Sequence, residues 1–160
     1  MSGFYDVALI CLNGHVVNDS SRSRPQHNQK YCDKCGESTI SKCTKCGTDI
    51  RGDYHVPGVV VMSGMSTPPR YCHECGTAYP WTERALNVAN DIAGAIDSLS
   101  SDERRELQSS FPDLIKESPQ TEVAKLKFKK LMRKVGDESY QAVKSVLISV
   151  VSEAVKKAIF

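Results

Sequence analysis

Hydrophobic and polar positions follow different patterns in the two halves of the chain. In the first half the apolar residues come in short runs, and FYDVALICL at positions 4–12 and Val59–Met62 predict strands. The segment NDSSRSRPQHNQK, at positions 18–30, has no periodicity and predicts a surface loop. From Trp81 onward the apolar positions recur at helical spacing. We therefore expect strands and loops in the first half and helices alone in the second.

Four helices are predicted in the second half from the apolar spacing and the capping residues. The second is expected to stop before Phe111-Pro112-Asp113, because proline removes a helical hydrogen bond. Gly136 is expected to be the C-cap of the third helix. The last helix has a broad Val, Leu and Ile face, which we expect to pack in the core; self-association or partner binding is the alternative. The predicted helices cover residues 82–99, 101–108, 121–135 and 137–159.

All seven cysteines lie between Cys11 and Cys75. Their number is odd, six of them form Cys-x-x-Cys pairs, and Asp6 interrupts the apolar start where a secretory signal would need an unbroken run. These features argue against disulfides and for a cytoplasmic location. A segment of about 80 residues rich in Gly, Pro and Ser buries too little apolar surface to be stable without a cross-link. We therefore expect bound metal to supply the cross-link.

Zinc is the ion that thiolate pairs at this spacing favour. Each pair is followed by glycine, as in CDKCG, CTKCG and CHECG, and glycine permits the tight turn that directs two thiolates at one ion. Three pairs fill one and a half tetrahedral sites, so a fourth pair is needed, and Cys11-Leu-Asn-Gly-His15 supplies it. In the alternative, His15 is a surface histidine and Cys11 is a buried free thiol. His27 and His55, which lie in stretches expected to be flexible, are reserve ligands. The predicted ligands of two structural zinc sites are Cys11, His15, Cys32, Cys35, Cys43, Cys46, Cys72 and Cys75.

The sequence leaves open how these four pairs combine. Glu37–Lys42 is long enough for a short hairpin, which favours a nested order. In that order Cys32, Cys35, Cys43 and Cys46 form an inner site, and the remaining four ligands form an outer one. A sequential order, which joins the first two pairs and the last two, is the second option. A cross-braced order, as in RING domains, is the third.

The predicted fold class is α+β. A small N-terminal double zinc ribbon of short β-hairpins covers residues 1–80, and an all-α helical domain for oligomerisation or docking covers residues 81–160. Four segments resemble a bacterial family known as domain of unknown function 2321. This resemblance implies paired zinc ribbons with a helical C-terminal tail and implies no activity. The segments are YDVALICLNGHVVN, IRGDY, YCHECGTAYPWTE and PDLIKESPQTEVAKLKFKKLM.

Enzymatic activity is not expected. Eight ligands fill two tetrahedral sites completely, whereas catalytic zinc keeps an open position. The chain lacks the His-x-Glu of nucleobase deaminases, and His73-Glu74 does not continue as the His-Glu-x-x-His motif of metalloproteases. It also lacks a Walker A loop and a dinucleotide fingerprint. The charged residues of the last predicted helix, such as Lys144 and Glu153, exclude a transmembrane segment.

Two functions remain. The first is a non-catalytic zinc-ribbon adaptor or scaffold that mediates protein–protein interaction or self-association through the C-terminal helices. The second is a nucleic-acid-binding ribbon protein that uses Lys42, Lys45, Arg51 and Arg70 together with the basic helix 122–134. The formal charge is only +2, and seven thiolates with two Zn²⁺ would change it to about −1. Nucleic-acid binders usually have a clear positive excess and aromatic residues near it. The sequence therefore favours the adaptor, and the lysines of helix 122–134 are expected to form a solvated face.

Overall fold

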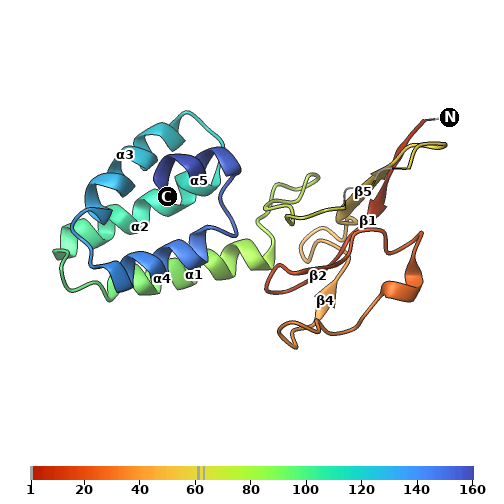
Figure 1. The fold of residues 1–160 in the computed structure, drawn as a ribbon, viewed down its shortest axis with the longest axis horizontal. Helices are drawn as coiled ribbons and strands as arrows, with labels where there is room; N and C mark the ends of the chain where they lie inside the picture. Colours follow the sequence, from red (N-terminus) through yellow and green to blue (C-terminus); the bar gives the residue numbers. More distant parts are fainter. Residues whose placement is uncertain (1, 61, 63) are drawn as a thin grey trace. The chain divides into compact units, whose positions relative to one another are not determined.

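Two small antiparallel sheets organise the first part of the chain, and helices form the second (Figure 1). The computed structural model describes residues 2–60, 62 and 64–160. Contacts divide it into two units, Met1–Glu83 and Arg84–Phe160. In the first unit, β1 (Phe4–Val7) pairs with β5 (Arg51–His55), and β2 (Leu9–Cys11) lies between β3 (Val16–Asn18) and β4 (Thr39–Ile40).

The strand predicted over residues 4–12 is two strands that belong to different sheets. Ala8 separates β1 from β2, is fully buried, and donates its N–H to the Ile50 carbonyl at 2.8 Å. Asp6, next to it in β1, is also buried, and its carboxylate accepts the backbone N–H groups of Arg22 at 3.0 Å and Ser23 at 3.1 Å. The chain passes from one sheet to the other here. Asp6 is held by the loop that follows β3, and Ala8 is held by Ile50, the residue before β5.

The strand predicted over Val59–Met62 is wrong where it can be checked. Residue 61 lies outside the described residues, and Val59, Val60 and Met62 have no strand structure. The strand in this region is β5, whose sequence RGDYH lacks apolar alternation. Its position is set by pairing with β1, in which Phe4 faces His55 and Tyr5 faces Tyr54.

The core of the first unit is small and includes two of the cysteines predicted to bind metal. Tyr79 and Trp81 stack with ring centroids 4.7 Å apart, and both are buried. They pack with Ala8, Ile10, Ile50, Cys43 and Cys72. Trp81 Nε1 donates to the Pro69 carbonyl at 2.8 Å, which fixes the indole. The small size of this apolar core agrees with the expectation that the unit needs a further cross-link.

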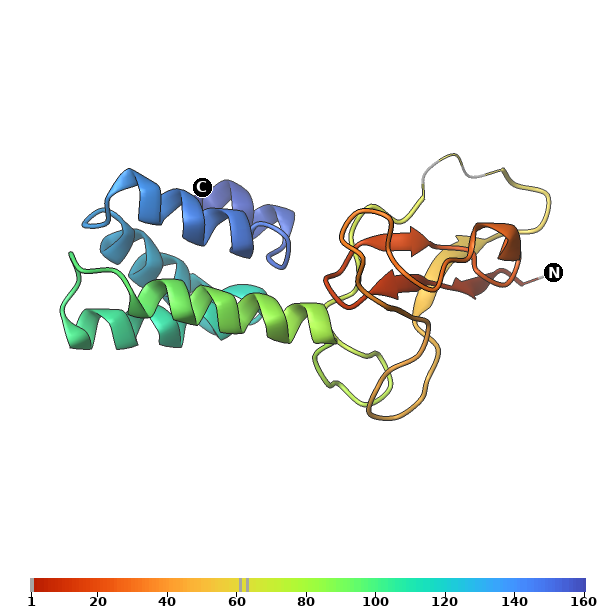
Figure 2. The ribbon, with the colours of Figure 1, turned by 90° about the horizontal axis from the view of Figure 1, so that it is seen from below.

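The described part of the chain holds five α-helices (Figures 1 and 2). The first begins within the first unit, and the others belong to the second. The helices α2, α3 and α5 pack together around Leu107, Phe111, Phe128 and Leu131. None of the described helices has the length and apolar character that a membrane crossing requires. The helices are α1 (Pro80–Gly94), α2 (Ser101–Ile115), α3 (Gln120–Met132), α4 (Asp137–Leu147) and α5 (Glu153–Ile159).

The predicted break at Pro112 is wrong, because α2 continues through this residue to Ile115. Phe111, Leu114 and Ile115 are fully buried, so the apolar face of the helix extends past the proline. Pro112 also accepts the N–H of Lys116 through its carbonyl at 3.1 Å. Burial of this face outweighs the helical hydrogen bond that a proline omits.

The last predicted helix is two helices. The helix is interrupted between α4, which ends at Leu147, and α5, which begins at Glu153. Ser152 is the N-cap of α5, since its hydroxyl accepts the N–H of Val155 at 3.4 Å. Gly136 has φ −64° and is the N-cap of α4, so it is not the left-handed C-cap predicted for the preceding helix. The apolar face predicted for this region is buried only in part: Val146 and Ala158 are half-buried and Ala154 is exposed. Its other six members are at most 6% exposed, namely Val143, Leu147, Val150, Val151, Val155 and Ile159.

Candidate metal centres

Three of the four ligand pairs are built as the same turn, called here a knuckle. In each, the glycine after the second cysteine donates its N–H to the carbonyl of the first at 2.8–2.9 Å. The first cysteine donates its N–H to the backbone carbonyl of the residue two positions past the second cysteine, at 2.8 Å. The glycines Gly36, Gly47 and Gly76 have φ between 70° and 75°, a left-handed conformation that other residues avoid. These turns are the second knuckle (Cys32–Cys35), the third (Cys43–Cys46) and the fourth (Cys72–Cys75).

The first knuckle, Cys11–His15, reaches the same result with different spacing. Gly14 donates to the Cys11 carbonyl at 2.8 Å, and Cys11 donates to the His15 carbonyl at 3.0 Å. Gly14 has φ 89°, and a Cβ atom there would lie 3.0 Å from Cβ of Trp81. The tight turn places His15 Nδ1 3.5 Å from Cys11 Sγ. The sequence predicted this pair, but nothing in it indicated that Trp81 packs on the turn.

The eight predicted ligand side chains lie in two groups of four. Within each group the ligand atoms are all within 4.8 Å of one another. The first and second knuckles form one group, and the third and fourth form the other. The favoured nested pairing is therefore wrong, and the order is sequential. The strand after the second knuckle explains the result: β4 pairs with β2, with Thr39 opposite Cys11, and so brings the second knuckle beside the first.

Distances within both groups fit a tetrahedral ion. With metal–sulfur bonds of about 2.3 Å and metal–nitrogen bonds of about 2.05 Å, a tetrahedron has S···S edges of about 3.8 Å and S···N edges of about 3.6 Å. In the first group, Cys11 Sγ lies 3.8 Å from Cys35 Sγ, and His15 Nδ1 lies 3.5 Å from Cys32 Sγ. In the second group, Cys43–Cys75 and Cys46–Cys72 are separated by 3.8 and 3.7 Å between Sγ atoms. Disulfides would require about 2.05 Å.

Hydrogen bonds to sulfur favour the thiolate form of Cys35 and Cys75. The backbone of Glu37 lowers the pKa of Cys35 to about 6, and the hydroxyl and backbone of Thr77 lower the pKa of Cys75 to about 6. Burial raises the pKa of Cys11, although its sulfur accepts the backbone N–H of His15 at 3.3 Å. A metal binds the thiolate, so the preformed N–H···S bonds suit a metal ligand.

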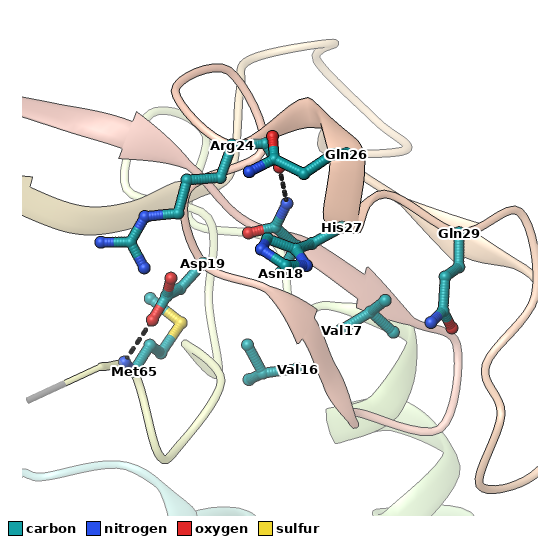
Figure 3. Close-up of a pocket in the computed structure, with 9 residues that line it drawn as sticks. All are labelled: Val16, Val17, Asn18, Asp19, Arg24, Gln26, His27, Gln29 and Met65. Carbon is teal, nitrogen blue, oxygen red and sulfur yellow. Dashed lines mark hydrogen bonds between the residues drawn. The ribbon is translucent and has the colours of Figure 1, made fainter.

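The other histidines considered from the sequence lie outside both groups. His55 stacks on Phe4 and lies with Nε2 3.6 Å from the Asp6 carboxylate. His27 ends the short 3₁₀ helix η1 (Pro25–His27) and lines a polar hollow of about 400 Å³ with Asp19 and Arg24 (Figure 3). The Asp19 carboxylate there accepts the N–H of Met65 at 2.8 Å (Figure 3). Neither histidine replaces His15.

The cations proposed for nucleic-acid contact differ in their surroundings. Lys42 pairs with Asp49 at 3.3 Å, whereas the Arg51 guanidinium lies 4.9 Å from the centroid of the Tyr5 ring. In the basic helix, Lys125 pairs with Glu122 at 2.7 Å, and Lys134 pairs with Glu103.

Fold and site together define an α+β protein with small antiparallel sheets and two Cys-rich tetrahedral groups, followed by a region of α-helices. The chain belongs to the bacterial family described as "Uncharacterized protein conserved in bacteria (DUF2321)", and the match covers residues 4–159. The resemblance noted in the sequence is thus confirmed over nearly the whole chain. No curated protein and no solved structure matches it.

Proposed function

We propose that this protein is a non-catalytic adaptor in which two structural zinc ions stabilise a rigid scaffold for protein–protein interaction. A structural role for the metals is supported by the ligand sets, Cys₃His and Cys₄, because each gives an ion four protein ligands. Catalytic zinc needs a coordination position for water or substrate, and neither group leaves one. The energy of metal binding would then contribute to folding of the first unit.

The observation that carries the adaptor proposal is an exposed aromatic surface on the β1–β5 sheet. Tyr5 and Tyr54 face each other across the strands with ring centroids 4.8 Å apart, and they are 52% and 44% exposed. Arg51 lies over the Tyr5 ring. Tyrosine and arginine are, with tryptophan, enriched at binding hot spots, and the contacts among these three side chains restrict their motion before a partner binds. We call Tyr5, Tyr54 and Arg51 the tyrosine face.

Nucleic-acid binding is the second candidate, because Arg51 and Tyr5 combine a cation with a ring on which a base could stack. The charge of the first unit argues against it. Residues 1–83 contain eight Lys/Arg and eight Asp/Glu. A Zn²⁺ with four thiolates carries two net negative charges, and one with three thiolates and a neutral imidazole carries one. The zinc-loaded unit is therefore net negative and would repel a phosphate backbone.

The test uses the zinc-loaded full chain as bait in a bacterial extract, with and without nuclease treatment. The variant Tyr5→Ala with Tyr54→Ala removes the tyrosine face, and Tyr31→Ala is the matched control, because Tyr31 is 65% exposed and lies outside this face. We expect one protein to be retained by the wild type and by Tyr31→Ala and lost from the double variant. Retention that disappears with nuclease would reject the adaptor in favour of nucleic-acid binding. Equal retention by all three proteins would show that no partner binds at the tyrosine face.

A further inference from the structure

The outer side of α3 combines free cations with exposed aliphatic side chains. Its inner side is buried and is formed by Ala124, Phe128, Leu131 and Met132. At 100° per residue, the positions from Lys129 to Lys127 span about 160° on the opposite side of the helix, and Glu122 lies in the same arc. We define the outer face of α3 as Val123, Leu126, Lys127, Lys129 and Lys130 together with the C-cap residue Arg133.

None of the four cations of this face has a carboxylate within ion-pair distance among the described residues. The neighbouring acids are already used, since Glu122 pairs with Lys125 and Glu103 pairs with Lys134. Glu103 also accepts the Ser100 N–H in a capping box, which fixes its position at the start of α2. The positive charge of the outer face is therefore available for a partner.

The two aliphatic residues lie among these cations. Leu126 is 70% exposed and Val123 is 54% exposed. On the helical wheel Leu126 falls between Arg133 and Lys130, and Val123 follows Lys130. Single exposed aliphatic residues are common on protein surfaces, but these two lie within a cluster of cations that have no ion-pair partner in the described part of the chain. A partner of this face therefore offers negative charge together with an apolar layer.

We propose that the outer face of α3 docks on an anionic phospholipid surface. Lysine and arginine would bind the lipid phosphates, while Leu126 and Val123 would enter the region between headgroups and acyl chains. The face is convex and belongs to one helix, so it fits a flat surface. The inference uses residues of α3 alone and does not depend on the adaptor proposal.

The composition of the face favours lipid over the two other polyanionic partners. A nucleic acid would contact the cations and leave Leu126 and Val123 without a partner. Protein interfaces are depleted of lysine and enriched in aromatic residues, whereas the outer face has three lysines and no ring. Clustered lysines attract anionic lipid headgroups, and neighbouring aliphatic side chains can enter the interface below them.

The experiment is co-sedimentation of the zinc-loaded full chain with vesicles of phosphatidylcholine, with and without about one third phosphatidylglycerol. We expect binding to the anionic vesicles alone and its loss at high salt. Each cation near such a surface contributes about a fivefold change in partition, so Lys129→Gln with Lys130→Gln is expected to weaken binding about 25-fold. The control Lys116→Gln with Lys157→Gln removes the same charge from exposed positions outside α3 and is expected to have little effect.

A second pair of variants tests insertion separately from charge. Leu126→Ser is expected to weaken binding about tenfold, whereas Val88→Ser, at a 45% exposed position in α1, is expected to leave it unchanged. Circular dichroism checks that all variants are folded. Equal binding to neutral vesicles, equal losses in the two lysine pairs, or no effect of Leu126→Ser would overturn the proposal. So would the absence of vesicle binding together with retention of duplex DNA or RNA that depends on Lys129 and Lys130.

Discussion

Substitution of Gly14 by alanine tests whether the packing of the first knuckle on Trp81 limits metal binding. A Cβ at Gly14 would lie 3.0 Å from Cβ and 3.2 Å from Cγ of Trp81. The indole cannot retreat easily, because it is 3% exposed, stacks on Tyr79 and donates to the Pro69 carbonyl. Gly36 provides the matched control in the same metal site. Its φ of 71° is also left-handed, but a Cβ there would meet no atom within 4 Å.

The two substitutions share one cost and differ in another. A left-handed conformation costs an alanine about 1–2 kcal/mol, and this cost applies at both positions. Only Gly14→Ala adds a steric clash in a packed core, which costs about 1–3 kcal/mol more. Because metal binding and folding of this unit are linked, the extra cost is expected to weaken zinc binding at the Cys₃His site by about 5-fold to 150-fold relative to Gly36→Ala.

The assay is a competition titration with a chelator of known zinc affinity. Trp81 is the only tryptophan of the chain, so its fluorescence reports on the core of the first unit as the metal leaves. Zinc release is measured in parallel with a colorimetric indicator. If Gly14→Ala and Gly36→Ala lower the affinity by the same factor, contact with Trp81 does not limit the turn and the reasoning fails.

Three further outcomes are expected. The wild type should bind two zinc ions per chain, and replacing both cysteines of the fourth knuckle by serine should leave a cobalt protein with the Cys₃His spectrum; a remaining tetrathiolate spectrum would restore the nested pairing. Lys134 lowers the pKa of Glu103, so the ion pair stabilises the helical unit above the unfolded-state pKa, and this stability is lost as the pH falls through the lower folded-state pKa. The difference in unfolding free energy between wild type and Glu103→Gln should thus shrink on acidification below about pH 4.5, and a difference that does not vary with pH would contradict this. Leu147→Asp should unfold the helical unit while the zinc content is retained, because it places a charge at a fully buried position. Ile148→Asp, at a 39% exposed position, should be tolerated, and circular dichroism with metal analysis measures both outcomes.

Much of the helical region could be predicted because its apolar spacing is regular. The predicted start near residue 82 lies within the first turn of α1. The errors came where tertiary packing outweighs local preference. Pro112 remains in a helix because Phe111 and Leu114 are buried on either side of it. The break before Ser152 could not be found from the apolar pattern, since Val150 and Val151 continue it through the break and are buried.

The sequence allowed the eight candidate ligands to be predicted, but not which knuckles combine to form each group. Cysteine spacing and the following glycine specify a knuckle locally, so eight side chains could be proposed as ligands. Pairing depends instead on which strand the chain joins after each knuckle. Thr39 and Ile40 are too short a run to be recognised as β4, yet their pairing with β2 decides that the second knuckle meets the first. The tyrosine face escaped notice for the same reason, because β5 has no strand pattern of its own.

Under the proposed zinc binding, sequential pairing also has a consequence for how the metals would be acquired during synthesis. Cys11 and Cys35 are 24 residues apart, and Cys43 and Cys75 are 32 residues apart. Each ion therefore closes a short loop of chain, called here a chelate ring. No ligand of the first ring has to wait for a ligand of the second to leave the ribosome. A nested arrangement would have held Cys11 unpaired until Cys75 emerged, and its longer outer loop would have cost more closure entropy. The first ion can therefore be captured while the third and fourth knuckles are still being translated, which shortens the time during which reactive thiols are exposed.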